Sequence, residues 1–389
     1  MTSGIVARIA ETYARDQERN AVAVSETDLP LSYESIPAEW LTRVLCKSVP
    51  GAQVTSFSLS APDDGSSNRR KIYLRYNQAG DAAGLPKALF CKATHDLANR
   101  MVLGVSGGAR CEVLFYRDIR PLLDIEAPQC FHAHINDETF NSIIMLGDVS
   151  ESVTEFCSHK TSMPRARAES QMRLLARLHG RVYGSARLQE LILQLPTWPG
   201  FFNGTLAFGM KEGSSKGFLS AESVVPPRLY RRFEEIWPAT LASVADQERL
   251  PHTLAHGDVH LKNWYVAGNG EMGLADWQCC SRGHWSRDVA YAVASALGTE
   301  DRRAWERELL QLYLQGLQAE GGPRIGFNEA WLAYRRQLMS ALTWWTVTLT
   351  PPEGLPDMQP RDTSLEFIRR ITTAIDDLDS LAAFRSAAT

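Results

Sequence analysis

The stretch His256-Gly257-Asp258-Val259-His260-Leu261-Lys262-Asn263, followed further on by Asp276, decides how this sequence of 389 residues is interpreted. A carboxylate such as Asp258 can accept the proton of a hydroxyl group, so this residue is the candidate general base. Amide and carboxylate oxygens are the hard ligands that Mg²⁺ prefers, and few are needed because the ion keeps several waters. Asn263 and Asp276 are therefore the candidate metal ligands.

The residues between Asn263 and Asp276 predict a short β-hairpin. Trp264 to Val266 and Met272 to Ala275 are strand-like, and the segment 268–270, Gly-Asn-Gly, forms the turn between them. An aspartate, an asparagine five residues later, and an aspartate beyond a hairpin follow the order of a kinase catalytic loop and metal loop. Phosphoryl transfer depends mainly on positioning and charge neutralisation, which three such side chains can supply.

Two other classes of function remain open on these residues. A metal-dependent hydrolase would use His256, Asp258 and His260 as ligands of a first-row metal. No further histidine-rich motif completes that set, and Asn263 would have no role in it. A non-catalytic nucleotide-binding module is the other alternative, although no reacting group is missing from the chain.

Outward from this stretch, the sequence predicts an α+β fold. Before residue 147 the pattern favours a sheet and one helix, and after it the pattern is mainly helical. The predicted strands cover residues 54–61, 71–76, 88–93, 128–134 and 142–145, with the helix at 109–123. Helices are expected at 165–179, at 229–245 and from 287 onward, whereas 191–220 is predicted to be irregular.

Composition narrows the class of protein. The length exceeds one typical core, which predicts two lobes, and 44% hydrophobic with 22% charged residues is ordinary for a globular protein. The net charge of -4 argues against nucleic acid as a partner. No run of 18 or more apolar residues is present, so we expect no membrane partner. Seven scattered cysteines without paired motifs favour a reduced, cytoplasmic setting.

The segment from His256 to Asn263 resembles the catalytic loop of the aminoglycoside phosphotransferase and choline kinase superfamily. Gly257 and His260 follow the small-molecule kinase pattern rather than that of protein kinases, and the chain looks closest to the bacterial ecdysteroid-kinase-like members. The resemblance implies a bilobal protein-kinase-like fold. It assigns 1–147 to a nucleotide-binding lobe of antiparallel sheet with one helix, 1–50 being a helical extension, and 148–389 to a larger catalytic and substrate-binding lobe. ATP, Mg²⁺ and a small-molecule hydroxyl acceptor are the implied cofactors and partner.

Further residues acquire roles through this resemblance. Lys92 corresponds to the lysine that binds the α- and β-phosphates, and Glu112 to its acidic partner. Asp288 corresponds to an aspartate that braces the catalytic loop, while His256 and His260 are expected to support it. The phosphate-covering turn is expected at Gly65, Ser66 and Ser67, and the adenine-binding hinge at Met145, Leu146, Gly147 and Asp148. The turn has a single glycine, and the hinge lacks the family's usual glutamate.

The acceptor is the least determined part. Residues 191–220 and 335–358 are expected to form its walls, and they are rich in aromatic side chains and poor in acids. An aromatic lining suits a largely apolar alcohol or a quaternary ammonium group. The alternatives are a polar cationic acceptor of the aminoglycoside or choline type, and aromatic residues that only fill the core. The candidate pocket residues are Trp198, Phe201, Phe202, Trp277, Trp344 and Trp345.

The sequence leaves open which groups two arginines near the metal loop contact. Arg282 and Arg287 follow Asp276 closely in the sequence. From the sequence alone, Asp276, a phosphate group and bulk solvent are equally open as their contacts.

Overall fold

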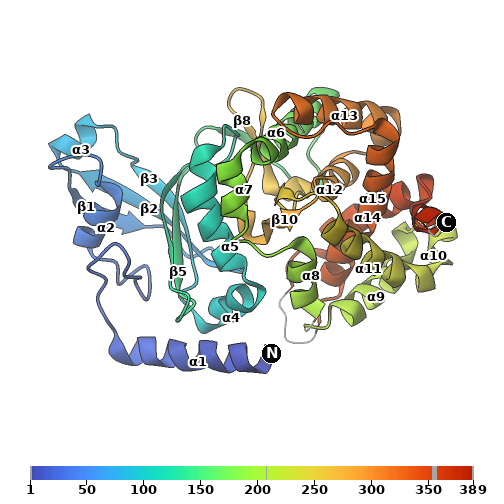
Figure 1. The fold of residues 1–389 in the computed structure, drawn as a ribbon. Coiled ribbons are helices and arrows are strands. Elements are labelled where there is room, and N and C mark those ends of the chain that lie inside the picture. The colour runs from blue at the N-terminus through green and yellow to red at the C-terminus, as the bar shows by residue number, and fades with distance from the viewer. Residues whose placement is uncertain (1, 207, 353–356, 388–389) are drawn as a thin grey trace. The chain divides into compact units, whose positions relative to one another are not determined.

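A computed structural model describes residues 2–206, 208–352 and 357–387 (Figure 1). The backbone contacts divide it into two compact units. The first comprises the described residues of Met1–Leu122 and Pro128–Ser152, and the second those of Leu123–Ala127 and Val153–Thr389. Glu353, in the second predicted wall of the acceptor pocket, lies outside the described residues.

The first unit is built on a five-stranded antiparallel sheet in the order β1-β2-β3-β5-β4. Side chains alternate between its faces, as the period of a strand requires. On β3, Leu89 and Cys91 face a core that includes Trp40 of helix α2, so Lys92 lies on the opposite face. The strands are β1 (Val54–Leu59), β2 (Asn68–Tyr76), β3 (Ala88–Ala93), β4 (Cys130–Ile135) and β5 (Ser142–Gly147).

Besides the helices expected in the extension 1–50, this unit contains two helices, at 78–82 and 97–106, that were not predicted. The expected helix is present as α5 (Gly108–Leu114), continued by a π turn at Phe115–Ile119 and a 3₁₀ turn at Arg120–Leu122. The others are α1 (Thr2–Arg19), α2 (Ala38–Leu45), α3 (Gln78–Ala82) and α4 (Leu97–Ser106). The prediction missed α4 because its valines and Gly104 lower helix propensity. Tertiary contacts stabilise it, since the buried Arg100 hydrogen-bonds Asp16 and two backbone carbonyls.

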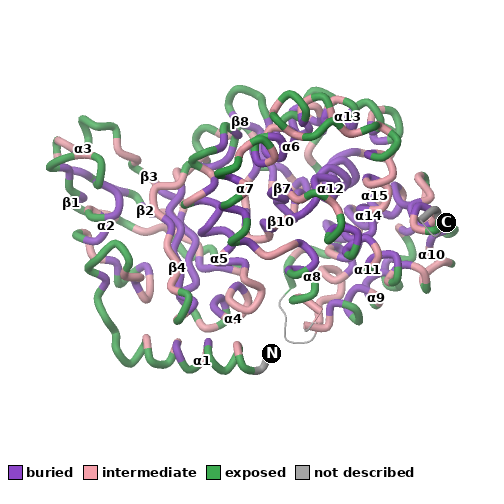
Figure 2. The backbone as a smooth tube through the Cα atoms, viewed as in Figure 1, coloured by how far each residue is buried: buried purple, intermediate pink, exposed green. Residues whose placement is uncertain are grey.

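The second unit is mainly helical, and Figure 2 shows the buried stretches of its inner helices. Small sheets frame the catalytic segment: β7 (Thr253–Ala255) pairs with β10 (Ser281–Gly283), and β8 (Trp264–Ala267) pairs with β6 (Val153–Phe156) and β9 (Met272–Leu274). The segment 256–263 between β7 and β8 is the candidate catalytic loop, called the catalytic loop below. The principal helices are α6 (Arg165–Gly184), α7 (Ala186–Ile192), α10 (Pro227–Tyr230), α11 (Phe233–Arg249), α12 (Ser286–Ala296), α13 (Thr299–Ala319), α14 (Phe327–Leu349) and α15 (Arg361–Asp377).

Most of the described residues in the segment 191–220 are helical, which corrects the prediction that it is irregular. It contains α8 (Trp198–Leu206) and α9 (Met210–Ser220). The glycines that suppress its helix propensity let α9 pack closely on α14: a Cβ on Gly217 would lie 1.8 Å from the Thr346 carbonyl oxygen. Close helix packing therefore explains the glycines, and this reason is visible only in three dimensions.

The mixed α+β class is confirmed, with a sheet-based unit and a helical one. Among the described residues, no helix is both long enough and apolar enough to cross a bilayer. All seven cysteines carry free thiols.

Candidate active site

Asp258 lies at the centre of the catalytic loop and is held by side chains from two elements. Its Oδ1 accepts a hydrogen bond from the Tyr291 hydroxyl of α12 at 3.2 Å, and its Oδ2 lies 3.4 Å from Nε2 of His260. The side chain is 18% exposed, so a substrate hydroxyl can still reach it. Burial alone would raise the pKa of Asp258, but His260, His256 and Arg287 outweigh it and the pKa is lowered. The carboxylate is therefore ionised and can accept a proton.

Asn263 is oriented by the same aspartate. Its amide nitrogen donates to the Asp258 carbonyl oxygen at 2.7 Å and lies 3.3 Å from Asp258 Oδ2. With the nitrogen fixed in this way, Oδ1 accepts no hydrogen bond from any described residue. Asn263 thus presents an amide oxygen next to the candidate base, which is the group that a hard cation binds.

Asp276 follows β9 in an unusual backbone conformation. Its φ of 64° and ψ of 69° lie in the left-handed region, and it precedes the 3₁₀ turn Trp277–Cys279. Such conformations cost energy for a residue with a Cβ and cluster at functional sites. The Ala275 N–H donates to the Asn263 carbonyl oxygen at 2.9 Å, which ties this turn to the catalytic loop. The backbone thus connects the two candidate metal ligands directly.

His256 is a structural residue of the loop. The Asp258 N–H donates to its Nδ1 at 3.2 Å, and its Nε2 lies 3.0 Å from the Ala275 carbonyl oxygen. Burial lowers the pKa of His256, so the ring is neutral with its proton on Nε2. Both nitrogens are used by the backbone, which removes His256 as a metal ligand. The hydrolase alternative loses one of its three ligands.

The peptide unit before Asp258 is held from several sides. Asp288, in the first turn of α12, accepts the N–H groups of His256 at 2.6 Å and Gly257 at 2.9 Å. The buried His179 also contacts Asp288, at 3.3 Å. Gly257 adopts φ +80°, and a Cβ there would lie 2.5 Å from the Cys279 carbonyl oxygen. Only glycine fits this turn, which directs Asp258 outward.

Lys92 and Glu112 form a buried ion pair in the first unit. Nζ of Lys92 on β3 lies 2.8 Å from Oε1 of Glu112 on α5, and the two side chains are 10% and 3% exposed. The alternation along β3 places Lys92 on the sheet face away from the α2 core, where α5 packs against β4 and β5. An ammonium group fixed in this way is oriented to bind an anion such as a phosphate.

Comparisons with known proteins agree with this geometry. The sequence model described as the Phosphotransferase enzyme family matches residues 159–325. The matched segment includes the candidate base and both candidate metal ligands. The protein is accordingly an enzyme that transfers phosphate to a hydroxyl group. No curated protein sequence matches the chain significantly.

Solved structures of related fold also resemble this phosphotransferase. A putative aminoglycoside phosphotransferase from Ralstonia eutropha is 14% identical over 88% of this chain and 97% of its own, with a TM-score of 0.50. An ethanolamine kinase from Plasmodium vivax is 13% identical over 96% of each chain, with a TM-score of 0.46. The first likeness supports the kinase-like fold. The narrower likeness to ecdysteroid-kinase-like proteins stays a prediction.

The turn between β1 and β2 is held by its own contacts. The Gly65 N–H donates to the Ser67 carbonyl oxygen at 3.0 Å, and the Gly65 carbonyl oxygen accepts from Asn99 at 2.8 Å. Ser66 is half-buried, and Ser67 is only 3% exposed. Backbone N–H groups of this turn were expected to face the phosphates, but that of Gly65 already donates within the turn.

The structure also shifts the stretch of backbone that is available to bind adenine. Met145, Leu146 and Gly147 lie in β5, which pairs with β3 on one edge and β4 on the other. The Gly147 N–H donates to the Gln129 carbonyl oxygen at 2.8 Å. Sheet pairing thus uses this stretch of backbone, and Asp148, held by Lys71 at 2.8 Å, is the first hinge residue beyond the strand. The segment after Gly147 is the better candidate for binding a nucleotide base.

The predicted acceptor aromatics divide into two groups. Trp198, Phe201 and Phe202 form a packed core cluster with Trp344 at its edge, which corrects their assignment as pocket residues. Trp277 is fully buried beneath the loop, with its ring 4.5 Å from that of His256. Trp345 lies nearer to the base, since its ring is 5.1 Å from that of His260. Most of these side chains therefore stabilise the site rather than line it.

Some residues around Asp258 were not predicted correctly. Tyr291 was missed, although its position three residues after Asp288 places it one helical turn along the same face. Arg287 was expected to contact Asp276, phosphate or solvent; it is fully buried and donates to the Gly257 carbonyl oxygen at 2.9 Å. Arg282 donates to the Leu195 carbonyl oxygen at 3.1 Å instead.

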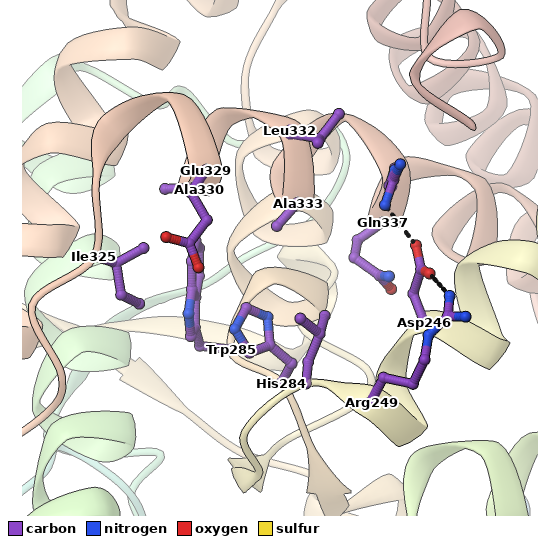
Figure 3. A pocket seen from close by; sticks show the side chains of 12 residues that line it. Asp246, Arg249, His284, Trp285, Ile325, Glu329, Ala330, Leu332, Ala333 and Gln337 are labelled. Atoms are coloured by element: carbon purple, nitrogen blue, oxygen red, sulfur yellow. Dashed lines mark hydrogen bonds and ion pairs between the residues drawn. The ribbon is translucent and has the colours of Figure 1, made fainter. Parts of the chain in front are cut away.

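A separate cavity of about 260 Å³ lies elsewhere in the second unit (Figure 3). Side chains of α11, of α14 and of the segment before α12 line it, among them Asp246, His284, Trp285 and Gln337. The catalytic loop contributes none of the lining residues, so this cavity is not part of the candidate active site.

Proposed function

We propose that this phosphotransferase moves the γ-phosphoryl group of ATP to the hydroxyl group of a small, largely apolar acceptor by direct in-line transfer. The observation that carries the proposal is the arrangement around Asp258. This ionised carboxylate is held by Tyr291 and His260, and the side-chain amide of Asn263 lies beside it. In this proposal Asp258 accepts the hydroxyl proton as the hydroxyl oxygen attacks the γ-phosphorus and ADP leaves.

The residues present fit a magnesium ion. The Asn263 amide oxygen and the Asp276 carboxylate are hard donors, and Mg²⁺ binds through one or two such groups together with phosphate oxygens and water. Among the described residues, no group of three or more histidine, cysteine, aspartate or glutamate side chains is placed to hold a metal ion. When bound, the ion neutralises the charge of the transferred phosphoryl group.

The nucleotide is assigned to Lys92 in this proposal. Its ammonium group would bind the α- and β-phosphates, and Glu112 would keep it extended toward them. Residues 1–147 are proposed as the nucleotide-binding lobe and 148–389 as the catalytic and acceptor-binding lobe. The adenine base of the nucleotide would contact the backbone that follows Gly147.

The side chains near Asp258 support an apolar acceptor over a polycation. The ring of His260 lies 6.0 Å from that of Phe367 on α15, in addition to Trp345. Lys262, on the catalytic loop, hydrogen-bonds the neutral amide of Gln359, and no described carboxylate lies within ion-pair distance of it. This lysine would repel a cationic acceptor, whereas an apolar acceptor can pack against the aromatic rings without that penalty.

The test is ATP consumption by the purified protein with Mg²⁺ and a panel of alcohols, sterols, choline, sugars and aminoglycosides. We expect turnover with an apolar alcohol, and the product should be a phosphate monoester. Asp258→Asn should lower kcat by about 10²- to 10⁴-fold while ATP still binds. Full activity in that variant would refute the role of Asp258, and turnover with aminoglycosides alone would refute the apolar acceptor.

A further inference from the structure

We propose that Arg287 is a positioning residue of the catalytic loop, and that the aromatic cluster around Trp198 serves to hold its guanidinium group against the Gly257 carbonyl. The proposal rests on the proposed function only in naming Asp258 as the group that is positioned. Arg287 would not touch the substrate.

The surroundings of Arg287 are unusual for a cation. The side chain has no exposed surface. Its guanidinium carbon lies 3.7 Å from the ring centroid of Trp198, 5.4 Å from that of Tyr291 and 5.8 Å from that of Trp344. No described carboxylate lies within ion-pair distance of it, although Asp288 and Asp258 are near enough to interact with its charge. Burying a charge is costly unless it is paired or hydrogen-bonded, so these rings, the hydrogen-bonding groups and the two nearby carboxylates must compensate for the lost water.

The hydrogen bonds of Arg287 show where this buried charge acts. Nη2 donates to the Gly257 carbonyl oxygen at 2.9 Å, and Nη1 donates to Ser340 Oγ on α14 at 2.8 Å. Ser340 anchors one end of the guanidinium plane, and the rings fix its tilt. The other end is therefore directed at the peptide bond that joins Gly257 to Asp258.

Two neighbouring residues of α12 thus hold opposite ends of Gly257. Asp288 accepts its N–H, and Arg287 donates to its carbonyl oxygen. Tyr291, on the same helix, binds the Asp258 carboxylate itself. With both ends of the glycine fixed, the left-handed turn at φ +80° has one orientation and Asp258 leaves it in one direction. Rotation of this peptide would move the base away from an attacking hydroxyl group, and small displacements of this kind are expensive in catalysis.

A purely structural role is the competing explanation, because any buried arginine contributes to stability. Arg302 provides the matched control. It is 1% exposed and lies in the same unit, but it binds Glu306 and Asp377, away from the loop. Arg287→Lys keeps the charge and the apolar stem but loses the forked guanidinium; Arg287→Met also loses the charge. Arg302→Lys and Arg302→Met are the controls, and Trp198→Phe keeps an aromatic ring with a smaller face.

Two measurements separate these roles in the full-length protein. The first is hydrogen–deuterium exchange of the peptides that cover residues 256–263, which requires no acceptor. We expect exchange of the loop amides to be about tenfold faster or more in both Arg287 variants, because a charged hydrogen bond is lost, and unchanged in both Arg302 variants. Trp198→Phe should show a smaller increase than Arg287→Lys. If Arg287→Met does not fold, Arg287→Lys decides the question.

The second measurement is steady-state kinetics with the acceptor found above. We expect kcat to fall about tenfold or more in Arg287→Lys while KM for ATP stays the same, and Arg302→Lys to leave kcat per folded molecule unchanged. Equal exchange rates in the unsubstituted protein and Arg287→Lys, with only a lower Tm, would overturn the positioning role. Absence of ATP-dependent transfer in the unsubstituted protein would instead overturn the proposed function, and the exchange measurement would still test Arg287.

Discussion

At the scale of single residues, Gly257 shows how strictly the catalytic loop constrains its sequence. Its φ of +80° is unfavourable for any residue with a Cβ, and the Cys279 carbonyl oxygen leaves no space for one. The bend allows the N–H of this residue to reach Asp288 while Asp258 faces outward. A glycine, which has no side chain, thus determines where the candidate base lies.

Gly257→Ala should therefore destabilise the protein and lower activity. We expect the free energy of unfolding to fall by about 1–3 kcal/mol from backbone strain, and further from the contact with Cys279. Urea unfolding followed by fluorescence measures this change. Gly270→Ala is the control, because Gly270 has φ +84° but nothing within 4 Å of a Cβ. Equal losses in the two variants would show that the contact with Cys279 has no effect.

Lys92→Met tests the nucleotide assignment at the same scale. We expect the Kd for ATP, measured by calorimetry, to rise about tenfold to a hundredfold, because the lost contact joins a cation to a phosphate. Lys87→Met is the control, since Lys87 is 75% exposed and lies 3.6 Å from Asp81. An unchanged Kd for Lys92→Met would remove this lysine from the site.

At the scale of elements, the first turn of α12 organises the catalytic loop. Asp288 lies at the helix N-terminus, where the helix dipole stabilises a carboxylate. Burial alone would raise its pKa, but His179, His256 and the Gly257 N–H outweigh this and the pKa is lowered. The helix thereby supplies an anion to the loop as well as Arg287 and Tyr291.

Asp288→Asn should weaken this connection although the shape of the side chain is kept. Each oxygen of Asp288 accepts a backbone N–H group, so the NH₂ group of an asparagine would face one of these N–H donors without an acceptor between them. We expect the free energy of unfolding to fall by about 1–3 kcal/mol and kcat to fall with it. Denaturant titration and the ATP assay measure the two effects. Asp301→Asn, at an exposed position in the first turn of α13, should be close to neutral; a similar loss there would indicate a general effect of charge removal.

At the scale of the whole molecule, both units bury histidines in neutral form. Burial lowers the pKa of His95 and His284 to about 3 and that of His132 to about 4. Unfolded histidine titrates near 6.5, so between these values the unfolded chain binds protons that the folded chain does not. Stability therefore rises with pH in this window and is lost as the pH falls below about 6.5.

We expect the Tm to be nearly constant above pH 7 and to fall between pH 6.5 and 5, before most carboxylates titrate. Each of these histidines adds a slope of up to about 1.4 kcal/mol per pH unit. A series of thermal melts from pH 8 to 5 tests this, with His284→Asn expected to have a shallower slope than the unsubstituted protein. A Tm that does not change with pH over this range would contradict the neutral burial of these residues.

The candidate reacting groups could be proposed from the sequence because they are local in it. Asp258, Asn263 and Asp276 lie on one loop and one hairpin, and short-range spacing and turn chemistry fix such segments. The strand positions of Lys92 and of the residues around it followed from alternation for the same reason. The sequence by itself thus determined the α+β class, the loop and the type of reaction.

Other features depend on contacts between segments far apart in the chain. The glycine-rich stretch 210–220 forms a helix that packs closely against α14. The aromatic residues near Trp198 surround the buried Arg287. The backbone of Met145 to Gly147 pairs with the two neighbouring strands of the sheet. Such outcomes depend on which partner a residue meets after folding, and local propensity and spacing carry no information about that partner. Only the tertiary structure decided them.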